Sequence, residues 1–196
     1  MRVGPEALDA AVEILSDAFS TDPLFDWFVR ADAQRPQARA RFFRFLLAEI
    51  GFRDGEVSLA GEGGAAAVWI PAPGPAPAPF WQEVQALPLL LGVTGWSRFG
   101  RLAALRTAMD AHHLKGPHAY LWFLGVRSGA QGRGLGSGLL DETLAPLDAA
   151  GVTAFLETAT QRNLPLYQSR GFRVTAEYRP GGDGPQTWAM VRTPTP

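Results

Sequence analysis

A glycine-rich turn after an apolar run is the stretch of this chain whose residue types and spacing are best suited to chemistry. The run, Tyr120 to Val126, is apolar and aromatic, which predicts a strand buried on both faces. After the turn an apolar stripe begins at helical spacing, formed by Leu135, Leu139, Leu140, Thr143 and Leu147. A helix N-terminus presents free N–H groups and the positive end of the helix dipole, and glycines let an anion approach the backbone. The pattern therefore predicts a phosphate-binding site.

Spacing separates three interpretations of this turn. A Walker loop ends in Gly-Lys-Ser or Gly-Lys-Thr, and the turn contains no lysine. The dinucleotide fingerprint G-x-G-x-x-G fails at its third glycine from either possible start, although Glu157 lies near the position of that motif's ribose-binding acid. The pattern Q-x-x-G-x-G fits without adjustment, as Gln131, Gly134 and Gly136. A glycine turn that binds no ligand is the remaining alternative.

Helices and strands that would position this turn can be predicted along the whole chain. Apolar residues recur at helical spacing over residues 5–20, 36–50, 79–91 and 95–113. Asp22 and Pro23 break the first helix, and a short aromatic segment, 24–28, follows. Strands are predicted over residues 56–59, 65–70, 152–158, 172–178 and 186–192. The proline-rich residues 71–79 are predicted to form an internal surface loop.

A short helix is predicted just beyond the strand that ends near Glu157. Asn163 is a good N-cap, and Pro165 suits the first helical turn because its missing N–H has no partner there. The helix carries Tyr167 and ends at Gly171. Ligands of open α/β sheets bind at the carboxyl ends of strands, so Glu157 and Tyr167 are candidate site residues.

Composition limits the classes of protein to which the chain can belong. Its 196 residues, 46% hydrophobic and 19% charged, predict a single domain over residues 1–196 with a substantial core. A net charge of −1 provides no basic surface for nucleic acid or an anionic membrane. With no cysteine and three histidines, neither a disulfide nor a metal site is expected. The N-terminus lacks a signal-peptide pattern and no apolar run is long enough to span a membrane, so a cytoplasmic protein is predicted.

The order of these elements resembles that of GCN5-related N-acetyltransferases, the GNAT superfamily, in which Q-x-x-G-x-G binds the pyrophosphate of acetyl-CoA. Within that superfamily the C-terminal half is similar to puromycin N-acetyltransferase and its relatives, through FLGVRSGAQGRGLGSGLL, AGVTAFLETATQRNLPLYQSRGFRVTAEY and GPQTWAMVR. AFSTDPLFDWF and GEVSLAGEGGAAAVWIPAP are similar more loosely. The resemblance implies an α/β fold with a mixed, mostly antiparallel central sheet of about six to seven strands, flanked by helices. It also implies a V-shaped splay between the pivotal strand and the next one.

Three positions depart from the pattern of the family. Only Met1 to Gly4 precede the first helix, so the usual first strand is hardly present. Ser128 stands where a proline is common after the pivotal strand. Thr160 stands where many members have an asparagine that contacts the coenzyme, whereas Asn163 lies closer to Tyr167. Capping of the short helix is therefore the main role predicted for Asn163, and contact with the coenzyme is its alternative role.

The resemblance implies acetyl-CoA as co-substrate and indicates which residues hold it. Backbone groups of Leu124, Gly125 and Val126 would bond the pantetheine arm like an added strand. The pyrophosphate would lie on the loop and helix start, formed by Gln131, Gly132, Arg133, Gly134, Leu135, Gly136 and Ser137.

Acetyl transfer to an amine also needs a base for the amine and a proton for the leaving thiolate. Tyr167 is the predicted general acid, because thiols ionise at about 8.5 and phenols at about 10; simple packing is the alternative. Glu157 is the predicted base, through water, because a buried carboxylate can have a raised pKa; a purely structural partner is the alternative. His113 and His118 are alternative proton relays. The residues predicted to contact the acceptor are Phe19, Asp22, Phe25, Trp69, His113 and His118.

These features predict an acetyl-CoA-dependent N-acetyltransferase in which the primary amine of a small molecule attacks directly in a ternary complex. No suitable nucleophile for a covalent enzyme intermediate is evident. Two alternatives remain, a catalytically inactive acyl-CoA-binding sensor or structural module, and an enzyme that acetylates protein or peptide amines. No nucleic-acid or membrane partner is expected, and the chain is predicted to be a monomer or a homodimer.

Overall fold

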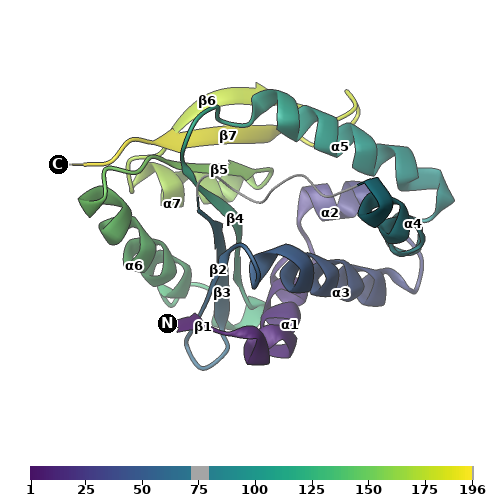
Figure 1. Ribbon diagram of the computed structural model, residues 1–196, viewed down its shortest axis with the longest axis horizontal. Coiled ribbons are helices and arrows are strands. Elements are labelled where there is room, and N and C mark those ends of the chain that lie inside the picture. The colour runs from purple at the N-terminus through teal and green to yellow at the C-terminus, as the bar shows by residue number, and fades with distance from the viewer. Residues whose placement is uncertain (72–79, 196) are drawn as a thin grey trace.

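The computed structural model describes residues 1–71 and 80–195, and its centre is a seven-stranded sheet (Figure 1). Its strands are β1 (Arg2–Val3), β2 (Glu56–Ala60), β3 (Ala65–Ile70), β4 (Ala119–Val126), β5 (Ala154–Thr158), β6 (Arg173–Tyr178) and β7 (Thr187–Arg192). They lie in the order β1-β2-β3-β4-β5-β7-β6. Every neighbouring pair is antiparallel except β4 and β5, which are parallel. The mixed, mostly antiparallel sheet is therefore confirmed, with a first strand of only two residues.

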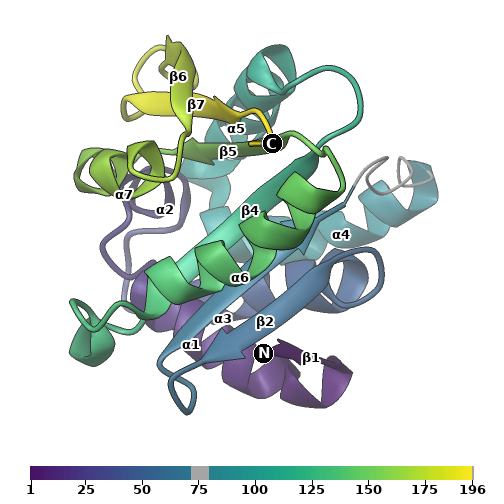
Figure 2. The ribbon, with the colours of Figure 1, turned by 90° about the vertical axis from the view of Figure 1, so that its left-hand side faces the viewer.

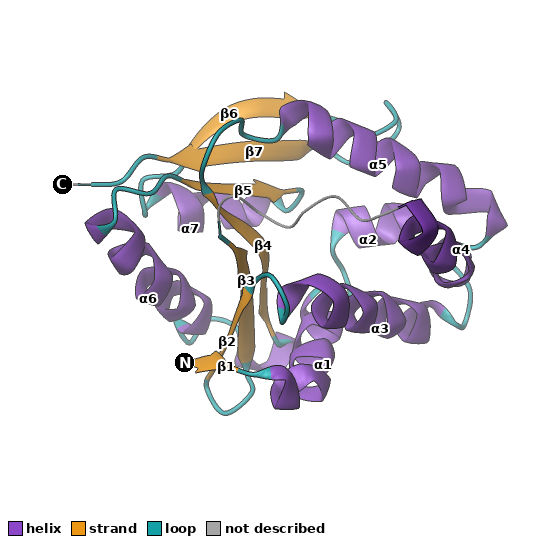
Figure 3. Cartoon of the chain, viewed as in Figure 1, coloured by secondary structure: helices purple, strands orange, loops and turns teal. Residues whose placement is uncertain are grey.

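The helices lie on both faces of this sheet (Figures 2 and 3). They are α1 (Leu8–Ala18), α2 (Pro23–Phe28), α3 (Arg35–Leu46), α4 (Phe80–Thr94), α5 (Phe99–His112), α6 (Leu135–Ala149) and α7 (Leu164–Gln168). In Figure 2, α6 lies on the viewer's side of the sheet, where it packs on β2, β3 and β4, whereas α1 and α3 lie on the far side. Among the described helices none is long and apolar enough to cross a membrane. The predicted proline-rich loop lies, from residue 72 to residue 79, outside the described part of the chain.

Alternation along β3 divides the core into two layers. Ala66, Val68 and Ile70 pack with α1, α2 and α3, whereas Ala65, Ala67 and Trp69 pack under α6. Phenylalanines dominate the first layer; the rings of Phe25 and Phe43, for example, stack with centroids 5.0 Å apart. Burying each such side chain contributes about 1.5–3 kcal/mol to stability.

The aromatic segment after Asp22 and Pro23 is helical, so the predicted break also begins a new element. The side-chain Oδ1 of Asp22 accepts hydrogen bonds from the backbone N–H groups of Leu24 (2.9 Å) and Phe25 (3.2 Å). Pro23 follows at the first helical position, where its fixed φ suits a helix. The capping carboxylate and the proline thus explain why α2 starts at Pro23, after the short turn that follows α1.

The predicted splay between the pivotal strand and the next one is confirmed. β4 and β5 pair only over Ala119–Leu121 and Ala154–Leu156, although β4 continues to Val126. On its other side β4 stays paired with β3 to its end, with one irregularity in register near Trp122. Gly125 lets α1 approach this strand, because a Cβ there would lie 2.8 Å from the Cβ of Ala18. Beyond Leu121, none of the described strands pairs with the β5-facing edge of β4.

Candidate active site

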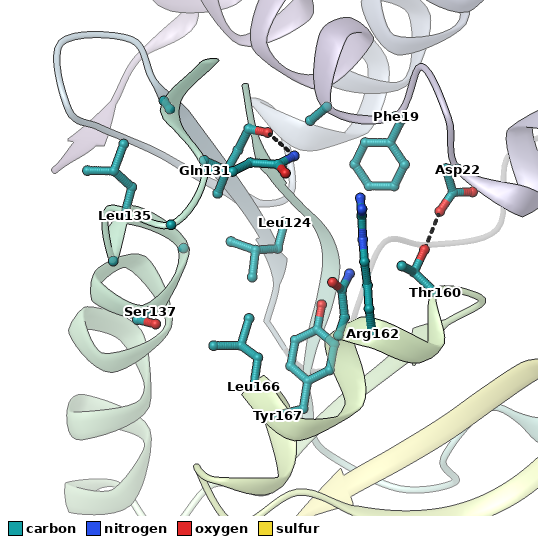
Figure 4. A pocket seen from close by; sticks show the side chains of 18 of the residues that line it. Phe19, Asp22, Leu124, Gln131, Leu135, Ser137, Thr160, Arg162, Leu166 and Tyr167 are labelled. Carbon is teal, nitrogen blue, oxygen red and sulfur yellow. Dashed lines mark hydrogen bonds between the residues drawn. The ribbon is translucent and has the colours of Figure 1, made fainter. Parts of the chain in front are cut away.

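A cavity of about 550 Å³ lies where β4 and β5 separate (Figure 4). Its walls come from four segments that are distant in sequence: the turn after α1, the end of β4, the glycine-rich turn with the first residues of α6, and the segment that enters α7. They contribute Ala18, Phe19, Thr21, Asp22, Leu124, Gly125, Val126, Ala130, Gln131, Gly132, Gly134, Leu135, Gly136, Ser137, Thr160, Arg162, Asn163, Leu166 and Tyr167. Nearly all of the predicted cofactor-binding residues therefore lie together; Arg133 is exposed beside the loop and is not part of the wall.

Two different structural reasons explain why glycine occupies these positions of the turn. Gly132 and Gly134 have φ values of +76° and +78°, in the left-handed region that other residues rarely adopt. Gly136 lies in the first turn of α6, where an added Cβ would be 3.2 Å from Cγ2 of Val126. The first two glycines thus shape the loop, and the third lets the helix approach β4.

The N-terminus of α6 opens onto the cavity. Gly134 is its N-cap residue and has no capping side chain, and Leu135, Gly136 and Ser137 of the first turn line the wall. The first N–H groups of a helix have no partner within the helix, and the dipole adds positive potential there. Together with the unpaired edge of β4, this arrangement fits a ligand with a phosphate group and an extended, strand-like arm. The residues present therefore fit acetyl-CoA.

Tyr167 and Asp22 lie in the same cavity. Tyr167 is 5% exposed, and its ring points from α7 into the cavity (Figure 4). Oδ2 of Asp22 accepts a hydrogen bond from Oγ1 of Thr160 at 3.2 Å. Burial raises the pKa of Asp22. Burial, followed by the charge of Asp22, raises the pKa of Tyr167 well above its ordinary value, so the phenol keeps its proton at neutral pH.

Glu157 lies on the opposite face of the sheet from α6 and is not part of this cavity wall. Residues alternate along β5: Leu156 belongs to the layer under α6, and Phe155 packs on the other face. Glu157 shares the face of Phe155 and accepts hydrogen bonds from the hydroxyls of Tyr120 and Tyr178. Burial raises the pKa of Glu157 to about 7, and those two hydrogen bonds lower it in part. The carboxylate therefore changes its charge in the neutral pH range.

The six predicted acceptor contacts do not form one cluster. Phe19 and Asp22 line the cavity. Phe25 is 5% exposed and lies in the phenylalanine core, and Trp69 is 3% exposed beneath α6. The side chains of His113 and His118 meet with their Nε2 atoms 3.1 Å apart. The His113 ring contacts Tyr120 and Phe155, so these histidines lie beside the residues that neighbour Glu157 and not in the cavity wall.

The predicted helix cap at Asn163 is wrong. Gln161–Asn163 forms a 3-10 turn that continues directly into α7, and Asn163 has φ −87° and ψ −14°. A capping residue needs an extended backbone for its side chain to reach the first helical N–H groups, and Asn163 is already helical. Its side chain makes no cap hydrogen bond, and the residue lines the cavity instead.

Several residues of the site were not predicted. Thr160, Arg162 and Leu166 line the cavity, and Figure 4 shows the Arg162 side chain extending beside Tyr167 toward Phe19. Their nearness in sequence to Tyr167 was a usable signal. Tyr178 reaches Glu157 from β6, and no local pattern indicates this contact because β7 lies between β6 and β5.

Comparisons with known proteins agree with this geometry. A model described as "Acetyltransferase (GNAT) family" matches residues 73–172. A Corynebacterium glutamicum structure described as "histone acetyltransferase HPA2 and related acetyltransferase" is 23% identical, with a TM-score of 0.73 over 100% of this chain and 96% of that one. Drosophila melanogaster polyamine N-acetyltransferase is 18% identical, with a TM-score of 0.59 over 98% and 97%. Arylalkylamine N-acetyltransferase 2 from Aedes aegypti is 13% identical, with a TM-score of 0.63 over 100% and 98%. At these identities the likeness to the solved structures is one of fold.

Proposed function

The chain belongs to the acetyltransferase (GNAT) family, and from that premise we propose that it acetylates the primary amine of a small molecule. One observation carries the proposal. The uncapped N-terminus of α6, the unpaired edge of β4 and the phenol of Tyr167 all border a single cavity. An anion site, a site for an extended arm and a proton donor are what acetyl transfer from a coenzyme thioester needs.

Acetyl-CoA, when bound, supplies a thioester whose carbonyl carbon accepts the amine. The loop from Gly132 to Ser137 would bind its pyrophosphate through backbone N–H groups, and the edge of β4 at Leu124 to Val126 would hold its pantetheine arm. Asn163, which lines the same wall, is a further proposed contact.

Tyr167 is the proposed general acid and Glu157 the proposed base. The phenol of Tyr167 is protonated at neutral pH and therefore holds a proton for a departing thiolate, although its raised pKa makes it a weaker acid than a free phenol. Glu157 has a pKa of about 7, which lies near the operating pH where a general base is most effective. Because Glu157 is not in the cavity wall, its proton transfer would run through water.

The acceptor is proposed to be a small amine that enters beside Phe19 and Asp22, where a buried carboxylate can attract a cationic group. Sequence similarity of the C-terminal half to puromycin N-acetyltransferase supports an aminonucleoside. The Drosophila enzyme, described as forming N-acetylagmatine, and the mosquito arylalkylamine enzyme support small amines more generally.

A thiol-release assay with acetyl-CoA and a panel of amines tests the proposal. The panel contains puromycin, agmatine, a polyamine, an arylalkylamine and a peptide with a free N-terminus. We expect release with at least one small amine, and strongly reduced release by Tyr167→Phe. Release with the peptide alone would favour a protein acetyltransferase. Tight binding of acetyl-CoA with no release from any amine would favour a sensor.

A further inference from the structure

Glu157 is held between two tyrosine hydroxyls, and this arrangement goes beyond what a base alone requires. The Tyr178 hydroxyl donates a short hydrogen bond to Oε1, and the Tyr120 hydroxyl donates one of 3.1 Å to Oε2. We propose that Tyr120 and Tyr178 are positioning residues that together hold the Glu157 side chain in one orientation and favour its carboxylate form over its protonated form. This inference rests on the proposed role of Glu157 as the base.

The three residues come from three strands, and the sheet order explains how they meet. Tyr120 lies on β4, which pairs with β5 where Tyr120 opposes Phe155. Tyr178 lies on β6 and must reach across β7 to β5. The β7 residue opposite Glu157 is Ala189, whose side chain is a single methyl group. Because a methyl group projects only a short distance from the sheet, the long Tyr178 side chain can extend over Ala189 to Oε1 of Glu157.

Helix α5 and the segment after it supply the other titratable groups around this clamp. The ring of His112 stacks on Tyr178, with centroids 4.1 Å apart and an interplanar angle of 5°. His113 meets Tyr120 edge-on at 4.9 Å, and burial, then the neighbouring His118, lower the pKa of His113. His112 favours the charged form of Glu157, and Asp110 opposes it.

Of the interactions that favour the charged carboxylate, the two phenol hydrogen bonds are larger than the attraction of His112, and Tyr178 contributes more than Tyr120. Hydrogen bonds to a charged form favour that form, whereas burial disfavours it. Each carboxylate oxygen has a second lone pair, so Glu157 can still accept a proton through water while both phenols stay bound. The clamp therefore opposes the effect of burial without blocking the base.

Direct titration of Glu157 tests the clamp independently of catalysis. Carbon-13 NMR of glutamate-labelled protein gives the midpoint of Glu157, identified by its loss in Glu157→Gln. We expect Tyr178→Phe and Tyr120→Phe each to raise the midpoint, by about one pH unit and more for Tyr178, because burial remains while one donor is lost. Thr175→Val is the matched control on β6, since it removes a hydroxyl bonded to the backbone oxygen of Ala189 without touching Glu157. It should leave the midpoint unchanged.

A fluorinated tyrosine provides a second measurement that does not depend on the phenylalanine variants folding. The chain has three tyrosines, Tyr120, Tyr167 and Tyr178, so in a Tyr167→Phe background 3-fluorotyrosine labels only the clamp. Fluorine makes the phenol a stronger donor, and we expect the Glu157 midpoint to fall.

The results separate the clamp from the proposed function. An unchanged Glu157 midpoint in both folded phenylalanine variants, or in the fluorinated protein, would overturn the clamp. If the midpoint moves and the acid limb of kcat/KM moves with it, both the clamp and the base assignment are supported. If the midpoint moves while the acid limb stays, the clamp stands and Glu157 is not the base.

Discussion

Tyr167 is buried and Glu157 is partly buried, and burial has different chemical consequences for a phenol and a carboxyl group. For Tyr167 it raises a pKa that is already high, so the group remains a proton donor at neutral pH. For Glu157 it raises the pKa to about 7, so the group exchanges its proton near neutrality. Environments that separate two groups in this way are typical of acid and base pairs in enzymes.

The substitution Tyr167→Phe tests whether Tyr167 is the general acid. If the phenol protonates the leaving thiolate, kcat should fall by about 10²–10³, near the usual range for general acid catalysis. The dissociation constant of the coenzyme should change by less than about tenfold, since one neutral hydrogen bond is worth about 0.5–1.5 kcal/mol. Steady-state kinetics and calorimetry measure the two effects. A wild-type rate in a folded variant would mean that Tyr167 serves packing and that another group or water is the acid.

Glu157→Gln tests the base through its pH dependence. Wild-type kcat/KM should fall on the acid side with a midpoint near the Glu157 pKa of about 7. The variant should lose this limb and regain activity at high pH, where the amine deprotonates without help. Rates measured between pH 5.5 and pH 10 with one acceptor would show the difference. An acid limb that persists unchanged in the variant would assign it to the substrate or to another residue.

Among the secondary-structure elements, the turn into α6 is the one that we propose binds the coenzyme directly. Gly132 and Gly134 of the turn have positive φ angles and line the cavity, and Gly136 leaves room for α6 to lie close to Val126 of β4. A bulky residue at Gly136 would therefore disturb packing as well as binding. Gly134, where an added Cβ meets nothing within 4 Å, is the cleaner position to alter.

Gly134→Ala should weaken coenzyme binding by about tenfold to a hundredfold, because the added Cβ would keep a phosphate oxygen away from a backbone N–H group, and a hydrogen bond to a charged group is worth about 1.5–3 kcal/mol. A left-handed φ should also cost about 1–2 kcal/mol of stability. Gly138→Ala is the matched control: it lies within α6, its Cβ would be in open space, and its φ is not positive. This variant should bind the coenzyme normally, and its free energy of unfolding should rise by about 0.5–1 kcal/mol. Calorimetry with coenzyme A measures the affinity of each variant. If Gly134→Ala binds coenzyme A as tightly as Gly138→Ala, the loop is not part of the binding site.

At the scale of the whole molecule, the coenzyme should bind the folded chain and stabilise it. A ligand at a hundredfold its dissociation constant adds about 2.7 kcal/mol, and each kcal/mol raises Tm by about 2–4 °C in a domain of this size. Differential scanning fluorimetry with acetyl-CoA and, as a control, NAD measures this. Stabilisation by NAD but not by acetyl-CoA would instead favour a dinucleotide site.

The pH dependence of stability follows from the same buried carboxyl. The pKa of Glu157 is about 7 in the folded chain against a reference of 4.5, so the folded state holds a proton that the unfolded state has lost between these values. The contribution of Glu157 to the stability of the folded chain is complete below about pH 4.5 and is lost as the pH rises to about 7. Glu157→Gln should therefore reduce the fall in the free energy of unfolding between low and high pH, by at most about 3 kcal/mol. This figure follows from about 1.4 kcal/mol for each unit of pKa difference. Urea unfolding of both proteins at pH 5 and pH 8 tests it, and identical changes would contradict it.

Asp148, at the C-terminal end of α6, makes the stability of the protein depend on pH in the opposite direction to Glu157. Arg192, whose side chain is 7% exposed, binds both of its carboxylate oxygens and joins the end of α6 to β7. This hydrogen bonding holds the pKa of Asp148 well below its usual range. Its contribution is therefore present above about pH 4, the usual carboxyl value, and is lost in acid.

The sequence by itself determined the parts of this protein that depend on local pattern. The turn at Gln131, Gly134 and Gly136 was predicted because left-handed glycines and helical periodicity are properties of neighbouring residues. The strands followed from the same local patterns, whereas the sheet type and the splay between the pivotal strand and the next one were implied by the family resemblance. Both are confirmed, and the structure places the splay after Leu121.

Only the tertiary structure decided which distant side chains meet. Phe25 looked like a pocket residue, but its ring fits among the other phenylalanines of the core. Asn163 looked like a helix cap, but the preceding 3-10 turn had already made its backbone helical. Tyr178 meets Glu157 because β7 enters the sheet between β5 and β6 with an alanine at the crossing point. Strand order and packing are long-range properties, so no spacing within one segment could have predicted these contacts.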